Sequence, residues 1–575
     1  MMTLIPRLIR RHTDQPGSWP PEMLPLLRRV YAARGCYTVD SAQPRLAQLA
    51  CPNGLTNLTT AVQLLARAIA LKQHILVVGD FDCDGATACA LAVRGLRLLG
   101  ADRVTYAVPH RLVHGYGLSS ALVEELAQYQ PDLLLTVDHG IACHAGVAAA
   151  KGRQWTVIVT DHHLPGETLP IADAIVNPNL AGDQFASKSL AGVGVVFYLL
   201  LALRGHFRQR MAHSAAAQAD LATLLDLVAV GTVADLVPLD GNNRALVAAG
   251  IRRLRHGLGC VGLRALIQHC GKNPAQLTAS DIGYALAPRL NAAGRLEDMA
   301  VGIDLLVTDE WDAALAIAER LDAINTQRKQ MQHEMLDAAA NAVAGLGDQP
   351  GGTAPAVCLY DPQWHPGVIG LVAAKMAERC HRPVVALAPS EPGSRLLRGS
   401  VRSIASIHVR DVLAQLHVRE PGCMTTFGGH AKAAGLSLWL EQLARFRQAF
   451  ASIVAQTLQS DALEPVIESD GELQQDEFDF RHAQALRFAG PWGQGFPEPV
   501  FDGVFEVVRW RVINASHLSL CLRPAHAPLT LNAIYFQGWQ GEPPPRRIVC
   551  AFRLACDEYK AHDAVQLIVA HIWPA

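Results

Sequence analysis

The sequence lacks the features that mark zinc-ribbon, disulfide-bonded or membrane-spanning proteins. Its 13 cysteines include no CxxC pair, which excludes zinc ribbons and thioredoxin-like redox motifs. No stretch approaches the roughly 20 uninterrupted apolar residues that a membrane-spanning helix needs. The net charge is only −2, which argues against a uniformly basic surface for nucleic acid but is compatible with a local basic groove.

The beginning of the chain also lacks a targeting signal. Its first 21 residues contain arginines but no apolar core, so we expect no signal peptide. An odd number of cysteines in a chain of this size argues against a disulfide framework. We therefore expect a reducing, cytoplasmic compartment.

The length of 575 residues is too great for one hydrophobic core, so several domains are expected. Residues 310–346 contain no proline and no glycine before Gly345, which predicts one long connecting helix, and GDQPGGT (347–353) is a plausible boundary after it. The predicted segments are a helical leader (1–70), an α/β domain (71–245), a helical extension with the long helix (246–350), a smaller α/β domain (351–458) and an all-β region (459–575).

Short apolar runs alternate with helical stretches between residues 70 and 240, and this alternation predicts a mostly parallel sheet. The runs are HILVVGD, RVTYAVP, LLLTVDHG, WTVIVTDHH and ADAIVNP. Ligands bind beyond the carboxyl ends of the strands in such sheets, and Asp80, Asp138 and Asp161 all follow predicted strands. Five further strand-like pieces after residue 465 suggest a small barrel or sandwich.

Acidic and histidine side chains gather at these strand ends: Asp80, Asp82, Asp84, Asp138, His139, Asp161, His162, His163 and Asp235. A single aspartate at a strand end is usually a helix cap or a turn former. Three alternate aspartates, followed by VDHG and TDHH after separate strands, favour a site for Mg or Mn, and so many acids suggest two metals. In an extended segment Asp80, Asp82 and Asp84 would point the same way, so one stretch would serve both metals.

The ordered set GDFDCDG, VDHG, TDHH and ADLVPL resembles the DHH phosphoesterase superfamily, and within it the RecJ family of single-stranded-DNA-specific exonucleases. Further matches are RLVHGYG (111–117), APRLNAAGRL (287–296), WHPGVIGLVAAKMAE (364–378), RGSVRSI (398–404), FGGHAKAAG (427–435) and AGPWGQGFPEPVF (489–501). The implied fold class is α/β: a parallel-sheet DHH domain, joined by a long helix to a smaller α/β DHH-associated domain, and then a C-terminal OB-like barrel.

The resemblance implies two divalent cations, Mn²⁺ or Mg²⁺, as cofactors. The implied ligands are Asp82, Asp84, Asp138, His162 and Asp235, with Asp138 as the bridge. Asp80 is expected as a further ligand or a supporting acid, and His163 is expected to face the scissile phosphate. His139 is left unassigned.

The resemblance also implies phosphate-binding residues, which in the second lobe are Arg398, Ser400, Arg402, Gly429 and His430. Arg111, Arg289 and Arg295 are expected to join Ser400 and Arg402 around a terminal 5′-phosphate in a narrow cleft, and Tyr116 to stack on a base. The alternative for His430 is a tight turn that leads into a helix. For Arg289 and Arg295 it is packing or ion pairing within a helix cap, and for Tyr116 it is an ordinary buried tyrosine. In the barrel, Trp510, Arg511, Arg546 and Arg547 are candidate DNA contacts, whereas Trp492 and Phe496 are expected to pack in a turn.

The predicted function is a metal-dependent 5′-to-3′ exonuclease that degrades single-stranded DNA to 5′-mononucleotides in DNA repair and recombination. The family implies single-strand-binding protein and a RecQ-type helicase as partners; we expect a monomer and no membrane. One alternative is a DHH enzyme for a small substrate such as pyrophosphate or a cyclic dinucleotide, against which the roughly 110 residues beyond the second lobe argue. Another is an inactive single-strand-binding protein, against which the intact ligand positions argue.

Overall fold

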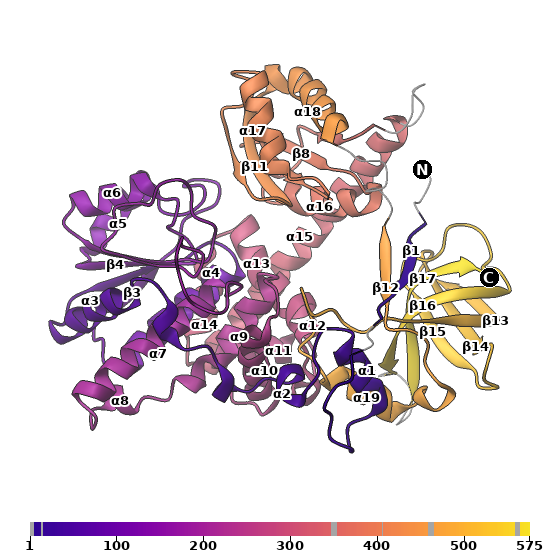
Figure 1. Cartoon of the computed structure of the whole chain (residues 1–575). Coiled ribbons are helices and arrows are strands. Elements are labelled where there is room, and N and C mark those ends of the chain that lie inside the picture. The colour runs from indigo at the N-terminus through magenta and orange to yellow at the C-terminus, as the bar shows by residue number, and fades with distance from the viewer. Residues whose placement is uncertain (1–4, 13–14, 347–353, 405, 458–464, 558–563) are drawn as a thin grey trace. The chain divides into compact units, whose positions relative to one another are not determined.

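The computed structural model (Figure 1) describes residues 5–12, 15–346, 354–404, 406–457, 465–557 and 564–575. The chain forms two compact units, each of which is described by itself. The larger unit comprises Leu8–Asn291, Asp298–Leu321 and Ile467–Ala575, and the smaller comprises Met1–Arg7, Ala292–Glu297 and Asp322–Val466.

The sheet of the larger unit is entirely parallel, with strand order β3-β2-β4-β5-β6. Every residue of β2 and β4 is buried, as expected for strands covered on both faces. The strands are β2 (Ile75–Val78), β3 (Val104–Ala107), β4 (Leu133–Val137), β5 (Thr156–Thr160) and β6 (Ala174–Val176). The prediction of a parallel sheet is therefore confirmed.

Helices cover both faces of this sheet. Helices α5 (Ser120–Leu126) and α6 (His144–Gly152) share one apolar core with it, and α4 (Cys83–Leu98) packs with α7 (Gly192–Arg210) and α9 (Leu225–Ala234) (Figure 1). The chain runs from β2 to β3 on one side and then returns to β4 on the other. This reversal opens a crevice at the carboxyl ends of β2 and β4, where doubly wound sheets bind ligands.

The helical extension follows the sheet and includes the long helix that the sequence predicted. Arg289 and Arg295 lie within α13 rather than in a turn that caps a helix. A π-helix (Ile282–Leu286) leads directly into α13. The helices of this region are α10 (Gly241–Arg255), α11 (Val261–His269), α12 (Ala279–Asp281), α13 (Ala287–Leu296), α14 (Ala300–Val307) and α15 (Trp311–Leu346), and the short α8 (Ala215–Gln218) precedes them between α7 and α9. The predicted boundaries at 350/351 and 458/459 lie outside the described residues.

The smaller unit has a five-stranded sheet, in the order β10-β11-β9-β8-β7, in which only β7 and β8 are parallel. One face packs on α17 (Val409–Arg419) and α18 (Leu443–Thr457), and the other on α16 (Ile369–Cys380) and the later part of α15. The strands are β7 (Val357–Tyr360), β8 (Val384–Pro389), β9 (Leu396–Arg402), β10 (Thr426–Gly429) and β11 (Ala433–Trp439). His430 joins β10 to β11, so the alternative of a turn into a helix is wrong.

The C-terminal strands close into a barrel in the order β13-β14-β15-β17-β16, which decides between the barrel and the sandwich. Helix α19 (Phe480–Phe488), which was not predicted, packs on this barrel. The strands are β13 (Phe501–Ile513), β14 (His517–Pro524), β15 (Leu531–Tyr535), β16 (Arg547–Cys556) and β17 (Val565–Pro574). No helix in the described ranges is long and apolar enough to cross a membrane.

The leader is not wholly helical, because β1 (Arg7–Arg10) pairs with β12 (Val466–Ser469). Its helices are α1 (Pro25–Ala32), α2 (Val39–Ala42) and α3 (Leu58–Ala70). The apolar face of α1 is part of the barrel core. Trp492 stacks on Phe496 with ring centroids 5.2 Å apart, in agreement with their expected packing role.

A buried ion pair joins the leader to the segment before the barrel. The Arg34 guanidinium donates two hydrogen bonds to the Asp470 carboxylate, at 2.8 and 2.9 Å, and both side chains are almost fully buried. It also lies 5.3 Å from the Trp492 ring. This pair couples two segments that are 436 residues apart in the sequence.

We predict that Arg34→Ala lowers the free energy of unfolding of the larger unit by about 3 kcal/mol, because it leaves a buried carboxylate without its main partner. Urea denaturation measures the change. Arg45→Ala is the control, because Arg45 forms an exposed ion pair with Asp40 and its loss costs at most about 1 kcal/mol. Equal effects of the two substitutions would contradict this role for Arg34.

Candidate active site

The turn from β2 into α4 presents three aspartates at the crevice. Asp80 follows β2 directly, and Asp82 caps α4 by accepting the Gly85 N–H at 3.1 Å. Asp84 lies in the first turn of α4, where its oxygens accept the N–H groups of Gly192 (2.6 Å) and Val193 (3.0 Å). Because α4 begins at Cys83, the segment is not extended as the sequence suggested. The turn, rather than strand alternation, directs these acids.

Two other elements bring acids to the same place. Asp138 follows β4 in a left-handed backbone conformation, with φ of 65°, and is buried. Asp235 ends α9. His162 Nε2 lies 3.2 Å from an Asp138 oxygen and 3.5 Å from an Asp235 oxygen. These contacts show that the residues at the ends of β4, β5 and α9 meet at the His162 imidazole.

The assembled side chains could hold metal ions. Three groups each offer ligand atoms that lie within 4.8 Å of one another: Asp80 with Asp82 and Asp138; Asp84 with His162 and Asp235; and Asp138 with His162 and His163. Because Asp138 and His162 each occur in two groups, the three groups form one acidic cluster. Carboxylate and imidazole ligands together suit Mn²⁺, and the carboxylates also suit Mg²⁺.

The carboxylates of the acidic cluster repel one another, and a bound cation would relieve this repulsion. Burial, together with repulsion from Asp82, raises the pKa of Asp80 to about 8 and that of Asp84 to about 7. Burial and neighbouring carboxylates raise the pKa values of Asp138 and Asp235 well above the usual range. Among the described residues, one oxygen of Asp80, one of Asp138 and Nε2 of His162 are buried without a hydrogen-bond partner. Divalent cations would satisfy these atoms and cancel the repulsion.

Asp161 has a different role from the other acids. Its carboxylate accepts hydrogen bonds from the backbone N–H groups of Ile141, His162 and His163 and from His163 Nδ1. Although burial opposes ionisation, these donors hold the pKa of Asp161 well below its usual range. Asp161 therefore fixes the loop after β5 rather than facing the acidic cluster.

His163 is the member of the acidic cluster whose pKa is raised in favour of the charged imidazole. Burial opposes protonation, but the hydrogen bond to Asp161 raises the pKa of His163 to about 9. The Tyr116 hydroxyl lies 3.3 Å from His163 Nδ1, and 51% of Tyr116 is exposed, so it is not an ordinary buried tyrosine. Arg111 lies 3.7 Å above the ring of Phe81. Together these side chains form a cationic and aromatic edge to the crevice.

His139, which sequence reasoning left unassigned, is a neutral structural residue. It is fully buried, its Nε2 donates to the carbonyl of Val78 at 3.0 Å, and burial lowers its pKa to about 4. It ties the loop after β4 to β2.

Backbone and side-chain groups that the sequence did not predict orient the aspartates. The Asn291 side chain accepts the N–H of Cys83 at 2.9 Å, so α13 holds the turn that carries Asp82 and Asp84. Gly192 donates to Asp84 and also lies against Asp138, because a Cβ there would be 2.5 Å from the Asp138 carboxylate. The available signals were the asparagine within APRLNAAGRL and the first glycine of LAGVG (190–194).

The expected phosphate-binding residues fall in both units. In the larger unit, Arg289 donates to the Ala285 carbonyl at 2.7 Å. In the smaller unit, Arg398, Ser400 and Arg402 share one face of β9 because they occupy alternate positions. Arg402 donates to the Ser400 hydroxyl at 2.9 Å.

The start of α16 adjoins this face of β9. A Cβ on Gly370 would lie 3.2 Å from the Ser400 hydroxyl and 3.3 Å from Arg402, and Arg295 donates to the Gly367 carbonyl at 3.3 Å. Arg295, Ser400 and Arg402 therefore gather beside a helix N-terminus, which favours anions.

The hairpin between β10 and β11 depends on Gly429. Its φ is 141°, and a Cβ there would lie 2.4 Å from the Ala434 backbone. The N–H of His430 donates to the Ala433 carbonyl at 2.8 Å. Gly429 thus allows the tight turn that presents His430.

Comparison with known proteins assigns the chain to a family. The DHH family N-terminal domain matches residues 74–232, the DHHA1 domain 353–456 and the RecJ OB domain 469–571. The single-stranded-DNA-specific exonuclease RecJ of Dickeya dadantii is 45% identical over 581 residues, which cover 100% of both chains. The chain belongs to the RecJ family of single-stranded-DNA-specific exonucleases. The RecJ exonuclease of Escherichia coli is 44% identical over 99% of both chains.

Solved RecJ structures share the fold. RecJ from Thermus thermophilus in complex with Mn²⁺ has a TM-score of 0.79 at 30% identity and covers 99% of this chain and 79% of that one. The same protein in complex with Mg²⁺ has a TM-score of 0.74 at 28% identity, with 99% and 78% covered. The predicted fold class, with DHH, DHH-associated and OB domains, is confirmed.

The raised carboxylate pKa values predict how pH acts on the metal-free protein. Between the unfolded value of about 4 and the folded values of about 7 to 8, the folded state binds more protons, so stability falls as pH rises through this window. We expect the unfolding temperature of the chelated protein to fall from pH 5 to pH 8, and Mn²⁺ to raise it more at pH 8.

Scanning calorimetry of wild type and Asp80→Asn measures this effect. The amide cannot ionise, so the variant should lose less stability between the two pH values. A variant with an unchanged pH dependence would show that Asp80 does not carry the repulsion.

Gly192 offers a steric test of the acidic cluster. Gly192→Ala would push its Cβ against Asp138, so we expect nuclease activity to fall by more than about 100-fold. Gly205→Ala, in the same helix α7, is the matched control, because a Cβ there meets nothing within 4 Å. Rates are measured on single-stranded DNA with Mn²⁺. Retained activity in Gly192→Ala would mean that Asp138 can move without consequence.

Proposed function

We propose that this chain is a metal-dependent 5′-to-3′ exonuclease that degrades single-stranded DNA to 5′-mononucleotides. The observation that carries the proposal is the acidic cluster, with its buried unpartnered ligand atoms, in a chain that matches named RecJ exonucleases over its whole length. The RecJ relatives with Mn²⁺ and Mg²⁺ support the choice of cation.

Five residues are proposed to hold two cations: Asp82, Asp84, Asp138, His162 and Asp235, with Asp138 shared. When bound there, two such cations would supply a hydroxide nucleophile near neutral pH and would stabilise the charge that develops during phosphodiester hydrolysis. Asp80 is proposed as a supporting acid or a further ligand. The amides of Gly192 and Val193 orient Asp84, and Asn291 orients the turn before it.

His163 is proposed to contact the scissile phosphate. The hydrogen bond to Asp161 raises its pKa, which favours a protonated imidazole that donates to a phosphate oxygen. Asp161 positions the ring through Nδ1, which directs the other nitrogen away from Asp161. Tyr116, which is half exposed beside His163, is proposed to contact the adjacent base or sugar.

The polarity of degradation is proposed to come from recognition of a terminal 5′-phosphate. The gathering of Arg295, Ser400 and Arg402 beside the start of α16 supports a phosphate site in the smaller unit. Arg111 and Arg289, which belong to the larger unit, are each proposed to bind phosphate. Arg398 and His430, presented by the Gly429 turn, are proposed to hold internal phosphates.

The biological setting follows the family. We propose a role in DNA repair and recombination, in a cytoplasm whose reducing conditions suit 13 cysteines that are all free thiols in the structure. Single-strand-binding protein and a RecQ-type helicase are proposed partners, and a monomer the proposed state. The domain boundaries at 70, 245, 350 and 458 remain proposals.

The decisive test is digestion of 5′-labelled and 3′-labelled single-stranded DNA with Mn²⁺ by wild type, Asp82→Ala and Asp138→Ala. We expect labelled mononucleotide to appear at once from the 5′ label, and each substitution to lower the rate by more than about 100-fold. Asp102→Ala is the control, because Asp102 forms an exposed ion pair with Lys72.

Each part of the proposal has its own contrary result. Full activity in both variants would refute the metal assignment. Release that begins at the 3′ label would refute the polarity. Hydrolysis of pyrophosphate or a cyclic dinucleotide without cleavage of DNA would favour the small-substrate alternative.

A further inference from the structure

The larger unit contains a cavity of about 730 Å³ that shares no residue with the acidic cluster. Its lining residues come from α2, α10, α12, α19 and the barrel strands β16 and β17. The volume is in the range of small-molecule sites in proteins. The cavity is therefore large enough for a ligand that the acidic cluster does not bind.

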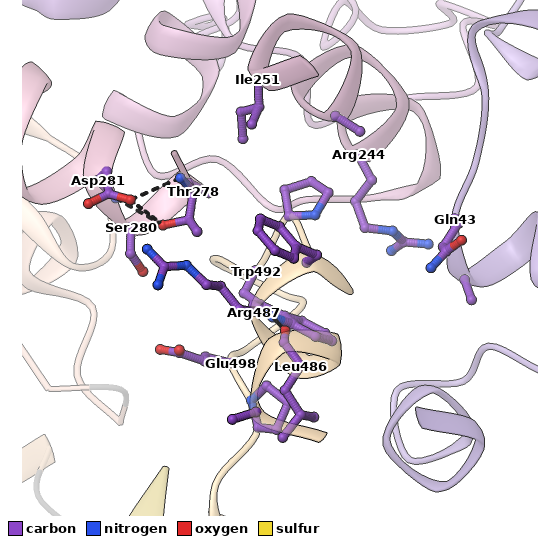
Figure 2. A pocket seen from close by; sticks show the side chains of 18 of the residues that line it. Gln43, Arg244, Ile251, Thr278, Ser280, Asp281, Leu486, Arg487, Trp492 and Glu498 are labelled. Atoms are coloured by element: carbon purple, nitrogen blue, oxygen red, sulfur yellow. Dashed lines mark hydrogen bonds between the residues drawn. The ribbon is translucent and has the colours of Figure 1, made fainter. Parts of the chain in front are cut away.

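Helix α10 turns one face toward this cavity. Residues 244, 248, 251, 252 and 255 line it, and apart from the adjacent pair 251 and 252 their spacing of three or four is that of residues on one side of a helix. This spacing brings the guanidinium groups of Arg252 and Arg255 to the same wall. Arg487, from α19, extends toward Ser280 and Asp281 on α12 (Figure 2).

The lining is unbalanced in charge. Six arginines (Arg45, Arg244, Arg252, Arg255, Arg487 and Arg553) line it with only Asp281 and Glu498 as acids. Glu498 pairs with Arg553, Arg45 pairs with Asp40 outside the cavity, and Asp281 pairs with Lys272. Within the part of the chain that the structure describes, neither Arg252 nor Arg255 has a carboxylate at ion-pair distance.

Of the other arginines, Arg244 is directed away from Arg252 and Arg255, whereas the charge of Arg487 acts on Arg255. Arg244 is directed toward Gln43 (Figure 2) and donates to the carbonyls of Leu239 and Ser41. Burial, and then the charges of Arg487 and Arg252, lower the pKa of Arg255. Cations that face one another in a cavity are stabilised by an anion between them.

The cavity also has an aromatic and apolar wall. The Arg255 guanidinium lies 4.6 Å from the Phe488 ring, and 37% of Phe488 is exposed. Ile251 and Leu486 extend this wall. A ligand that fits must combine a strongly negative group with a flat apolar one, and a nucleotide has both.

We propose that this cavity binds a free nucleoside 5′-monophosphate, with the phosphate between Arg252 and Arg255 and the base against Phe488. The choice rests on the proposed function, because a nucleoside monophosphate is the product of that reaction. A phosphomonoester carries a charge between about −1.5 and −2 at neutral pH, which matches two arginines. A phosphodiester inside a strand carries one charge and leaves one arginine uncompensated.

The test is equilibrium dialysis of labelled dAMP against the full chain in a chelator, so that no cation in the acidic cluster can hold the phosphate. We expect saturable binding that Arg252→Ala weakens by about tenfold or more, because a charge-assisted phosphate contact is lost. Arg253→Ala is the matched control: it neighbours Arg252 on α10, does not line the cavity and donates to the Leu258 carbonyl. Deoxyadenosine, which lacks the phosphate, should bind at least about tenfold more weakly than dAMP.

Because Arg252 is exposed, Arg252→Ala should stay folded, and its unfolding transition checks this. Absence of dAMP binding to the wild type, or equal binding by Arg252→Ala, overturns the proposal. The proposal is also overturned if a single-stranded oligonucleotide binds in a way that depends on Arg252 while dAMP does not bind. The cavity would then be a binding site for single-stranded DNA and not for the free mononucleotide. A chain without nuclease activity would refute the proposed function, yet the dialysis result would stand.

Discussion

Repulsion among buried carboxylates is the constraint on which the rest of this structure depends. Asp80, Asp84 and Asp138 are almost fully removed from water, and Asp82 and Asp235 adjoin them. No hydrophobic gain comes from such an arrangement, so the surrounding scaffold must hold it in place. The parallel sheet does so by reversing its winding at β2 and β4, where two neighbouring strands deliver their loops to one edge.

Backbone groups rather than counter-ions supply the local support. The first amides of α7 bind Asp84, Gly85 binds Asp82, and the Asn291 side chain holds the turn between them. These hydrogen bonds fix the geometry without cancelling the charge. The negative charge of the carboxylates therefore remains available to bind cations. For the same reason, replacing one of these aspartates by a neutral residue is expected to stabilise the metal-free protein. Asp161 differs because four donors satisfy it, and this makes it an organiser of His163.

Much of this could be predicted because strands buried on both faces leave an unmistakable apolar pattern. The five runs that end in Asp, His, Gly or Pro correspond to β2–β6, and the absence of proline and glycine within 311–344 corresponds to α15. The gathering of the acids followed from the rule that parallel strands end at one edge. Their individual directions did not follow, since only the start of α4 at Cys83 decides where Asp82 and Asp84 point.

Other features depend on partners far away in the sequence, which a local pattern does not contain. Strand β1 exists because β12, more than 450 residues later, pairs with it, and Asn291 acts on a turn about 200 residues earlier. The hairpin at His430 looked like a turn into a helix because its glycines obscure the strand pattern. The arginines of α10 belong to a charged helix by sequence, and only the packing of α19 and the barrel encloses them in a cavity.

The packing of the leader on the barrel has a consequence for synthesis of the chain. Leu26 and Val30 of α1 are buried among barrel residues such as Phe501 and Phe552, and Arg34 is neutralised by Asp470. During translation, this apolar helix emerges from the ribosome before the strands that cover it. The nascent chain must therefore carry an uncovered apolar helix through the folding of the DHH domain, which makes the leader a natural site for a chaperone to engage until the barrel closes.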